Sequence, residues 1–280
     1  MFYLLYNLES NSSSSKENLI KLYSVKFPGI KPIIFNGLDF KSFSSSLTKD
    51  DTVILSGGDG TINYFANTYK KYPFDARILY SADGTGNDFL RDIEKDGLIE
   101  LDKYIKKLPI VKINDKESFF INNASFGIDG TVCEVADRLK AKGKKYDYTK
   151  IARNLLLFKY KPCKAKIIVD GKEYNYKNVW LASCLNGRYV GGGMKIAPNQ
   201  DRKSSELSCV IIHGRFRLRI AIAFKSIFSG LHVKKYPQYV DVIKGKEISV
   251  TFDRPNAIQV DGETTLNVTS YFAGRGEKDE

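Results

Sequence analysis

Two glycine-rich loops, each placed directly after a predicted strand, constrain the fold of this chain most strongly. The first, Gly57-Gly58-Asp59-Gly60-Thr61, lies between the apolar run Thr52 to Ser56 and a helical stretch, Ile62 to Lys71. The second, Asp83-Gly84-Thr85-Gly86-Asn87-Asp88-Phe89, follows the apolar run Arg77 to Ser81. Because strands that alternate with helices form a parallel sheet, both loops are expected at one sheet edge, beyond the carboxyl ends of the strands, where ligands bind.

The same alternation of strands and helices extends back to the start of the chain. Strands are predicted at Phe2 to Tyr6 and Pro32 to Phe35, and helices at Glu17 to Lys26 and Asp88 to Asp92. The serine-rich segment Ser10 to Ser15 is interpreted as a loop between a strand and a helix. This pattern predicts a doubly wound α/β domain with a parallel sheet over residues 1–106.

From about residue 107 the pattern changes to short apolar segments typical of strands, which predicts a mainly β-sandwich second domain over residues 107–280, whose last strand segment could return to the first domain. These segments are Ser118 to Asn123, Ala165 to Val169, Val179 to Cys184, Leu207 to His213 and Ile248 to Phe252. The helical stretch Arg215 to Phe228 interrupts them. We interpret it as a helix packed on the sandwich, with contact to a membrane as the alternative.

Composition narrows the class of protein and its partners. A length of 280 residues suits two domains, and a net charge of +12 favours anionic partners such as lipid headgroups and nucleotides. Nucleic acid is disfavoured because no nucleic-acid motif accompanies the charge. There is no apolar run of roughly 20 residues and no leader pattern, so a cytoplasmic protein is expected. Four cysteines that are far apart in the sequence are expected to be reduced thiols.

The first loop has the features of a phosphate site. Glycines allow left-handed backbone angles and close approach of main-chain N–H groups, and the following helix directs its positive end at the ligand. Asp59 cannot attract a phosphate itself, so a metal-linked role is its natural use. The chain has neither the G-x-x-x-x-G-K-[ST] loop nor the H-R-D and D-F-G signatures of protein kinases.

The two loops resemble those of the diacylglycerol kinase catalytic-domain superfamily, which includes soluble bacterial lipid kinases and is related to the sphingosine kinases. Further matches extend the resemblance over nearly the whole chain: Phe120 to Asp129, Gly191-Gly192-Gly193-Met194 with Pro198, and Val260-Asp261-Gly262-Glu263. The resemblance implies an NAD-kinase-like nucleotide-binding domain, ATP and Mg²⁺ as cofactors, and transfer of the γ-phosphate to a lipid hydroxyl. Diacylglycerol is the expected acceptor and phosphatidic acid the product, a step of phospholipid biosynthesis.

The resemblance also assigns roles to individual residues. Asp261 is the expected general base, and Glu263 is expected to help hold Mg²⁺ or to orient Asp261. Asp59 and Asp88 are expected in the network that holds the catalytic Mg²⁺, so the predicted catalytic set is Asp261, Glu263, Asp59 and Asp88, and the metal set is Asp59, Asp88 and Glu263. The residues expected to contact ATP are Asn7, Gly57, Gly58, Gly60, Thr61, Gly84, Thr85, Gly86 and Asn87.

Several positions leave alternatives open. Asp261-Gly262 alone could be a tight hairpin turn. Lys112 stands where the family has an acid, and Ser204-Ser205-Glu206-Leu207 replaces a D-D-G-x-L segment that holds a structural Mg²⁺, unless Asp201 or Glu206 supplies the carboxylate.

An NAD kinase-like enzyme, or a regulatory protein that binds nucleotide or lipid with weakened catalysis, remains the alternative function. The expected partners are a lipid substrate at the inner membrane surface, where the protein is expected to bind peripherally, and anionic phospholipids. The resemblance also allows a homodimer.

Overall fold

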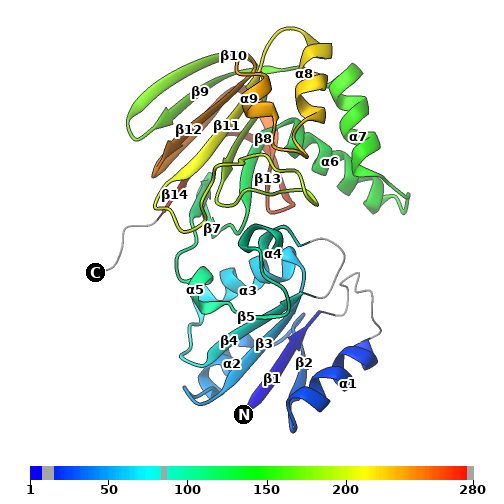
Figure 1. Cartoon of the computed structure of the whole chain (residues 1–280), viewed down its shortest axis with the longest axis vertical. Coiled ribbons are helices and arrows are strands. Elements are labelled where there is room, and N and C mark those ends of the chain that lie inside the picture. Colours follow the sequence, from blue (N-terminus) through cyan, green and yellow to red (C-terminus); the bar gives the residue numbers. More distant parts are fainter. Residues whose placement is uncertain (8–15, 83–86, 276–280) are drawn as a thin grey trace. The chain divides into compact units, whose positions relative to one another are not determined.

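The computed structural model describes residues 1–7, 16–82 and 87–275, and these form two compact units, Met1–Leu108 and Pro109–Glu280 (Figure 1). Each unit has its own sheet. The predicted loop at Ser10 to Ser15 and the glycines Gly84 and Gly86 lie outside the described residues.

The first unit is an α/β domain built on a sheet with the strand order β2-β1-β3-β4-β5 among the described residues. Its strands are β1 (Phe2–Tyr6), β2 (Lys31–Ile34), β3 (Thr52–Gly57), β4 (Arg77–Ala82) and β5 (Leu98–Glu100). Its helices are α1 (Lys16–Lys26), α2 (Phe40–Ser46), α3 (Asp59–Lys71), α4 (Asp88–Ile93) and α5 (Asp102–Ile105). The first four strands in this order are parallel, whereas β5 runs antiparallel to β4, which departs from the purely parallel sheet expected from the sequence.

Helices cover both faces of this sheet, and its central strands β1 and β3 are therefore buried on both sides. Strand β3 is buried at every position, as its unbroken apolar run predicts. On one face, Leu19 and Tyr23 of α1 pack against Leu4. On the other face, Tyr3 meets Phe43 of α2 edge to face at 5.5 Å. This arrangement is the predicted doubly wound architecture.

The parallel register brings three strand ends to one edge of the sheet. Tyr6, the last residue of β1, lies beside Ser56 of β3, and Gly57 lies beside Ala82, the last residue of β4. The chain therefore leaves β1, β3 and β4 at the same edge. This edge is where the two glycine-rich loops were predicted to meet.

The second unit is β-rich. Among the described residues its sheet has the strand order β12-β11-β10-β8-β13-β14-β6-β7, and β9 pairs with both β10 and β13. Its strands are β6 (Ile110–Ile113), β7 (Lys116–Phe119), β8 (Asn123–Gly127), β9 (Cys163–Val169), β10 (Lys172–Leu185), β11 (Leu207–His213), β12 (Val240–Gly245), β13 (Glu247–Val260) and β14 (Glu263–Gly274). Its helices are α6 (Ile128–Ala141), α7 (Tyr148–Asn154), the π-helix η1 (Leu155–Lys159), α8 (Arg217–Lys225) and α9 (His232–Lys235).

Two 14-residue strands, β10 and β13, run through both layers of this unit. Their first halves pair with β9 and their last residues pair with β8. The layers enclose an apolar core whose members include Phe126, Ile167 and Val250. A second apolar cluster, with Val132, Trp180 and Ile220 among its members, joins α6 and α8 to the sheet. This is the predicted β-sandwich with helices packed outside it (Figure 1).

Three details differ from the expectations. The last strand, β14, pairs with β13 and β6, so it stays in the second unit and does not return to the first. The predicted strand Ser118 to Asn123 is interrupted, because the N–H groups of residues 121–123 bond to the carboxylate of Asp261 instead of to a neighbouring strand. Helices α6 and α7 were not predicted, although Ile128, Val132, Val135 and Leu139 of α6 follow helical spacing.

Candidate functional site

The first glycine loop forms the junction between β3 and α3. Gly57 ends the strand, and Gly58 is the N-cap of the helix with φ −99°. A Cβ atom at Gly57 would lie 2.3 Å from Oγ1 of Thr61, so only glycine fits there. A Cβ atom at Gly58 or Gly60 would meet nothing within 4 Å. Gly57 is therefore required for close packing, and Gly58 and Gly60 leave the surface of the loop open. None of the three has the left-handed backbone that the sequence suggested.

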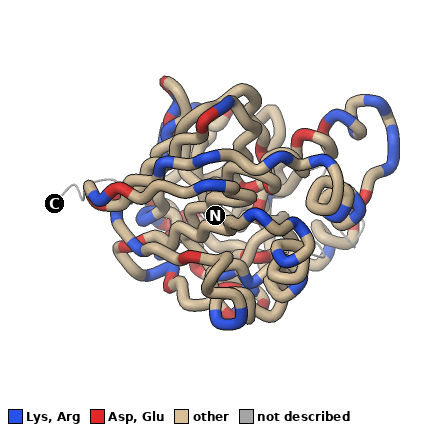
Figure 2. The backbone as a smooth tube through the Cα atoms, turned by 90° about the horizontal axis from the view of Figure 1, so that it is seen from above, with Lys and Arg blue, Asp and Glu red and all other residues tan. Residues whose placement is uncertain are grey.

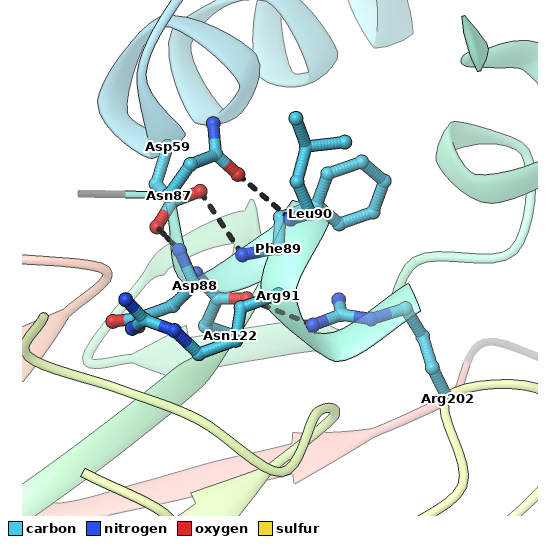
Figure 3. A network of polar contacts seen from close by, with 8 residues as sticks. All are labelled: Asp59, Asn87, Asp88, Phe89, Leu90, Arg91, Asn122 and Arg202. Atoms are coloured by element: carbon cyan, nitrogen blue, oxygen red, sulfur yellow. Dashed lines mark hydrogen bonds and ion pairs between the residues drawn. The ribbon is translucent and has the colours of Figure 1, made fainter. Parts of the chain in front are cut away.

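Asp59 joins this loop to the helix that follows the second loop (Figure 3). Its carboxylate accepts the N–H of Asp88 at 2.9 Å and the N–H of Phe89 at 3.3 Å, across 29 and 30 residues of sequence. Asn87 caps the same helix, because its Oδ1 accepts the N–H of Leu90 at 2.7 Å. A carboxylate at the N-terminus of α4 is favourable, since the free N–H groups there carry partial positive charge. The two predicted loops are therefore brought together by Asp59.

Asp88 and Tyr80 complete the contacts at this edge. Asp88 is buried and forms an ion pair with Nη1 of Arg91 at 2.7 Å. The hydroxyl of Tyr80 donates to the carbonyl of Gly57 at 2.7 Å and accepts a hydrogen bond from the Asn87 amide. Sequence reasoning missed Tyr80, because its hydrogen bonds to Gly57 and Asn87 form only in the folded chain.

The remaining predicted nucleotide contacts are Asn7 and three residues of the second loop. Gly84, Thr85 and Gly86 lie outside the described residues, so their assignment stays a prediction. Asn7 follows β1 at the same sheet edge.

In the second unit, Asp261 and Gly262 form the turn between β13 and β14. Both have positive φ, 47° and 95°, which is the conformation of a tight hairpin turn and which Asp and Gly tolerate. The carboxylate of Asp261 accepts three backbone N–H groups: those of Asn122 at 2.8 Å and Asn123 at 3.0 Å on Oδ1, and that of Ile121 on Oδ2. The side chain is thus fixed by the backbone between β7 and β8.

Gln259 connects this turn to a buried carboxyl group that the sequence did not single out. Its Oε1 accepts the N–H of Gly262 at 2.8 Å, and its Nε2 donates to Oδ2 of Asp129 at 2.6 Å. Burial raises the pKa of Asp129, and hydrogen bonds from Gln259 and other neighbours oppose that rise. Asp129 therefore supports the D-G-E turn from behind, at the start of α6.

Two arginines hold the other side of the segment that binds Asp261. Arg202 donates to the carbonyl of Ile121 and, at 2.8 Å, to Oδ1 of Asn122, a contact that Figure 3 also shows. Arg275 donates to Oδ1 of Asn186 at 2.7 Å and to the carbonyl of Arg202 at 3.1 Å. Sequence reasoning missed both arginines, because their partners are backbone and amide oxygens far away in the chain.

The residues that replace the family's structural Mg²⁺ segment do not fit a divalent ion. Gln200 donates its amide to the carbonyls of Asp201 and Glu206, at 3.1 Å and 2.9 Å. The carboxylate of Asp201 accepts the N–H of Lys203. A hard cation needs several converging carboxylate and carbonyl oxygens, and among the described residues Asp201 and Glu206 belong to no group of three His, Cys, Asp or Glu side chains that could hold a metal ion. The expectation that Asp201 or Glu206 replaces the missing ligand therefore finds no support.

Two further predicted residues lie at the surface. The ammonium group of Lys112 forms an exposed ion pair with Glu117 on the neighbouring strand, at 3.2 Å. Glu263 is exposed and begins β14 opposite Val260. Within residues 1–7, 16–82 and 87–275, no three His, Cys, Asp or Glu side chains converge as metal ligands. Of the predicted catalytic Mg²⁺ ligands, Asp59 and Asp88 belong to the first unit and Glu263 belongs to the second.

The fold and the joined loops define a class of protein that pairs a doubly wound α/β unit with an NAD kinase-like β-sandwich. Residues 2–114 match the diacylglycerol kinase catalytic domain, and residues 122–272 match the YegS C-terminal NAD kinase beta sandwich-like domain. The second match alone covers more than half of the chain. The chain therefore belongs to the diacylglycerol kinase catalytic-domain superfamily.

Individual relatives agree with this family at low identity. A protein of Mycobacterium tuberculosis named "Diacylglycerol kinase" is 27% identical over 194 residues, which is 66% of this chain and 62% of that protein. The Bacillus subtilis protein "Putative lipid kinase YtlR" is 24% identical over 75% of this chain and 73% of its own length.

Solved structures show the same fold. A crystal structure from Bacillus anthracis described as "a putative diacylglycerol kinase" has a TM-score of 0.69 and 20% identity, and covers 97% of this chain and 92% of its own.

Proposed function

We propose that this chain is an ATP- and Mg²⁺-dependent lipid kinase that transfers the γ-phosphate to diacylglycerol and forms phosphatidic acid. The observation that carries the proposal is the junction at Asp59, which joins two glycine-rich loops at the carboxyl edge of a parallel sheet. Ligands of open α/β sheets bind at that edge. The names of the relatives support a lipid as the acceptor.

The phosphates of ATP are proposed to bind over the start of α3. The surface above Gly58 and Gly60 is open, which lets an anion approach the backbone closely. The N-terminus of this 13-residue helix directs N–H groups and partial positive charge at the same place. Gly57 and Tyr80 keep the loop in this shape, because the first admits Thr61 and the second bonds the carbonyl of Gly57.

Asp261 is proposed as the general base. The lipid hydroxyl oxygen would attack the γ-phosphorus, its proton would pass to the carboxylate, and ADP would leave with the electrons of the broken P–O bond. The three N–H donors and Gln259 position the turn before substrate arrives.

Mg²⁺ would neutralise charge on the transferred phosphate. Asp59 fits a role in holding it, in part through water, because Mg²⁺ prefers carboxylate oxygens and this carboxylate lies where the two loops meet. Asp88 fits less well, because Arg91 offsets its charge. Glu263 is exposed and has the oxygen chemistry that Mg²⁺ prefers.

The proposal is tested by incubating the chain with γ-labelled ATP and Mg²⁺ and a panel of acceptors in mixed micelles, with NAD in a parallel reaction. Label in phosphatidic acid supports the proposed acceptor. Label in another lipid keeps the class of enzyme and changes its substrate. Label in NADP contradicts the proposal, and ATP binding without any transfer indicates a binding protein with lost catalysis.

A further inference from the structure

Helix α8 and the turns that follow it form a long basic stretch of the second unit. Between Glu206 and Asp241 the sequence has no acidic residue. The same interval carries six basic residues: Arg215, Arg217, Arg219, Lys225, Lys234 and Lys235. One face of α8 is buried through Ile220 and Ala223, and Ile227 after the helix joins the same apolar cluster, so the helix packs on the sheet as predicted. The opposite face remains in solvent.

That opposite face exposes large apolar side chains. Leu218 is 71% exposed and Ile222 is 55% exposed, and the spacing of four residues places them on one side of the helix. Phe216 before the helix and Phe228 after it are 59% and 61% exposed. Single exposed apolar residues are ordinary, but several close together within a basic stretch mark an interaction surface.

A second element extends this surface. Arg217 crosses to η1, where it donates to the carbonyls of Leu156 at 2.8 Å and Tyr160 at 2.7 Å, and it stacks on Trp180 at 4.8 Å. This fixes α8 against η1, whose Phe158 is 74% exposed. Arg217 itself is thereby used for structure. Arg219 is exposed and also donates to the hydroxyl of Tyr239 at 3.1 Å.

The chain that leads into η1 is also strongly basic. Residues 138–169 contain eleven Lys and Arg and a single acidic residue, Asp147. In Figure 2, Lys and Arg recur along the protruding connection between α6 and α7 at the right of the view. Charge of one sign thus surrounds the exposed apolar residues of α8 and η1.

We propose that the exposed face of α8, with Phe158 of η1 beside it, docks on membranes that contain anionic phospholipids. Leu218 and Ile222 would enter the boundary between headgroups and acyl chains, and Arg215, Arg219 and Lys225 would lie at the phosphates. A membrane suits this face better than a protein partner, because apolar tips ringed by cations on a convex helix match a flat anionic surface with an apolar interior. The inference concerns binding alone and does not require the proposed kinase activity.

Vesicle co-sedimentation of the full chain tests this surface. Vesicles of phosphatidylcholine with phosphatidylglycerol should bind the protein, and phosphatidylcholine alone should bind it far less. Replacing Arg215, Arg219 and Lys225 together by Gln should weaken binding about a hundredfold, at about fivefold per charge near a membrane surface. The combined change Leu218→Gln and Ile222→Gln should weaken it about tenfold or more.

The matched control uses another helix with exposed apolar residues. Leu22 and Val25 of α1 are 64% and 79% exposed and also have lysines nearby, so changing both to Gln should leave vesicle binding unchanged. Circular dichroism and thermal unfolding check that every variant folds. Phosphorylation of a short-chain, water-soluble diacylglycerol should persist in the α8 variants, which separates loss of docking from loss of chemistry.

Three results would overturn the inference. The first is equal binding of the unchanged chain to both kinds of vesicle, and the second is equal loss of binding in the α1 control. The third is a dimer in solution that the changes at Leu218 and Ile222 convert to a monomer, because the face would then join two copies of this chain.

Discussion

Replacing Asp261 by Asn separates the chemical role of this residue from its structural role. Asn retains an oxygen that can accept the N–H groups of Asn122 and Asn123, and it tolerates the positive φ of 47°. Its amide would face the N–H of Ile121, so one bond to a charged group is lost and the other two weaken. We expect a loss of about 2–4 kcal/mol in the free energy of unfolding. The melting temperature should fall by on the order of 10 °C.

The effect on catalysis should be much larger than this loss of stability explains. Removing a general base lowers turnover by about 10²–10⁴-fold, measured well below the melting temperature. ATP affinity should change little, because Asp261 belongs to the second unit and the proposed phosphate contacts belong to the first. Label transfer to lipid and equilibrium ATP binding measure the two quantities separately.

The chain supplies its own control for this experiment. Asp170 begins an identical Asp-Gly turn, with φ of 47° and 80°, between β9 and β10. Its carboxylate also accepts backbone N–H groups, from Glu247 at 2.9 Å and Lys246 at 3.0 Å. Asp170→Asn makes the same chemical change away from the site, and Asp170→Ala adds a comparable loss of stability. Both should keep turnover within about twofold, since neither touches the proposed base. Retained turnover in Asp261→Asn, or equal losses at Asp170 and Asp261, would refute the assignment.

Four further predictions concern the glycine loop, Arg202, Mg²⁺ and His232. Gly60→Ala should leave the melting temperature unchanged or raise it, because the site is open and helical, yet weaken ATP binding in calorimetry, whereas Gly57→Ala should destabilise the fold through the 2.3 Å contact with Thr61. Arg202→Met should cost about 1–3 kcal/mol in denaturant unfolding, because it removes a donor from Oδ1 of Asn122, whereas the carbonyl of Ile121 keeps the amide of Asn186. Neither Mg²⁺ nor a chelator should shift the melting temperature of the parent in the absence of nucleotide. Burial lowers the pKa of His232, so the unfolded chain takes up its proton first. Stability should therefore fall as the pH drops below the unfolded pKa of about 6.5. His232→Gln should reduce the dependence of the melting temperature on pH in that range.

The elements around the first site could be predicted because they depend on local sequence. The apolar run of β3 and the glycines after it determine where the strand ends and α3 begins. The same holds for the hairpin at Asp261, whose two residues suit a turn with positive φ. Local sequence could not predict which Asp-Gly turn belongs to the site, because Asp170 and Asp261 have the same turn and the same kind of backbone contacts. Only the family resemblance distinguished them.

The remaining contacts could not be predicted because they join distant parts of the chain. The side chain of Asp59 is of the type that binds metals, but its carboxylate also accepts the N–H of Asp88 at the start of α4, 29 residues away. Arg202 reaches Asn122 across 80 residues, and Gln259 reaches Asp129 across 130. Each of these bonds requires the tertiary fold, and no spacing rule identifies its partners.

The central claim is that the chain transfers phosphate from ATP to a lipid alcohol. The most direct measurement is the amount of ADP and of phosphorylated lipid formed together from ATP, Mg²⁺ and diacylglycerol in mixed micelles. We predict equal amounts of ADP and phosphatidic acid from the parent chain and from Asp170→Asn, and at least about a hundredfold less of both products from Asp261→Asn. ADP without phosphorylated lipid, or phosphatidic acid formed at an undiminished rate by Asp261→Asn, would contradict this account.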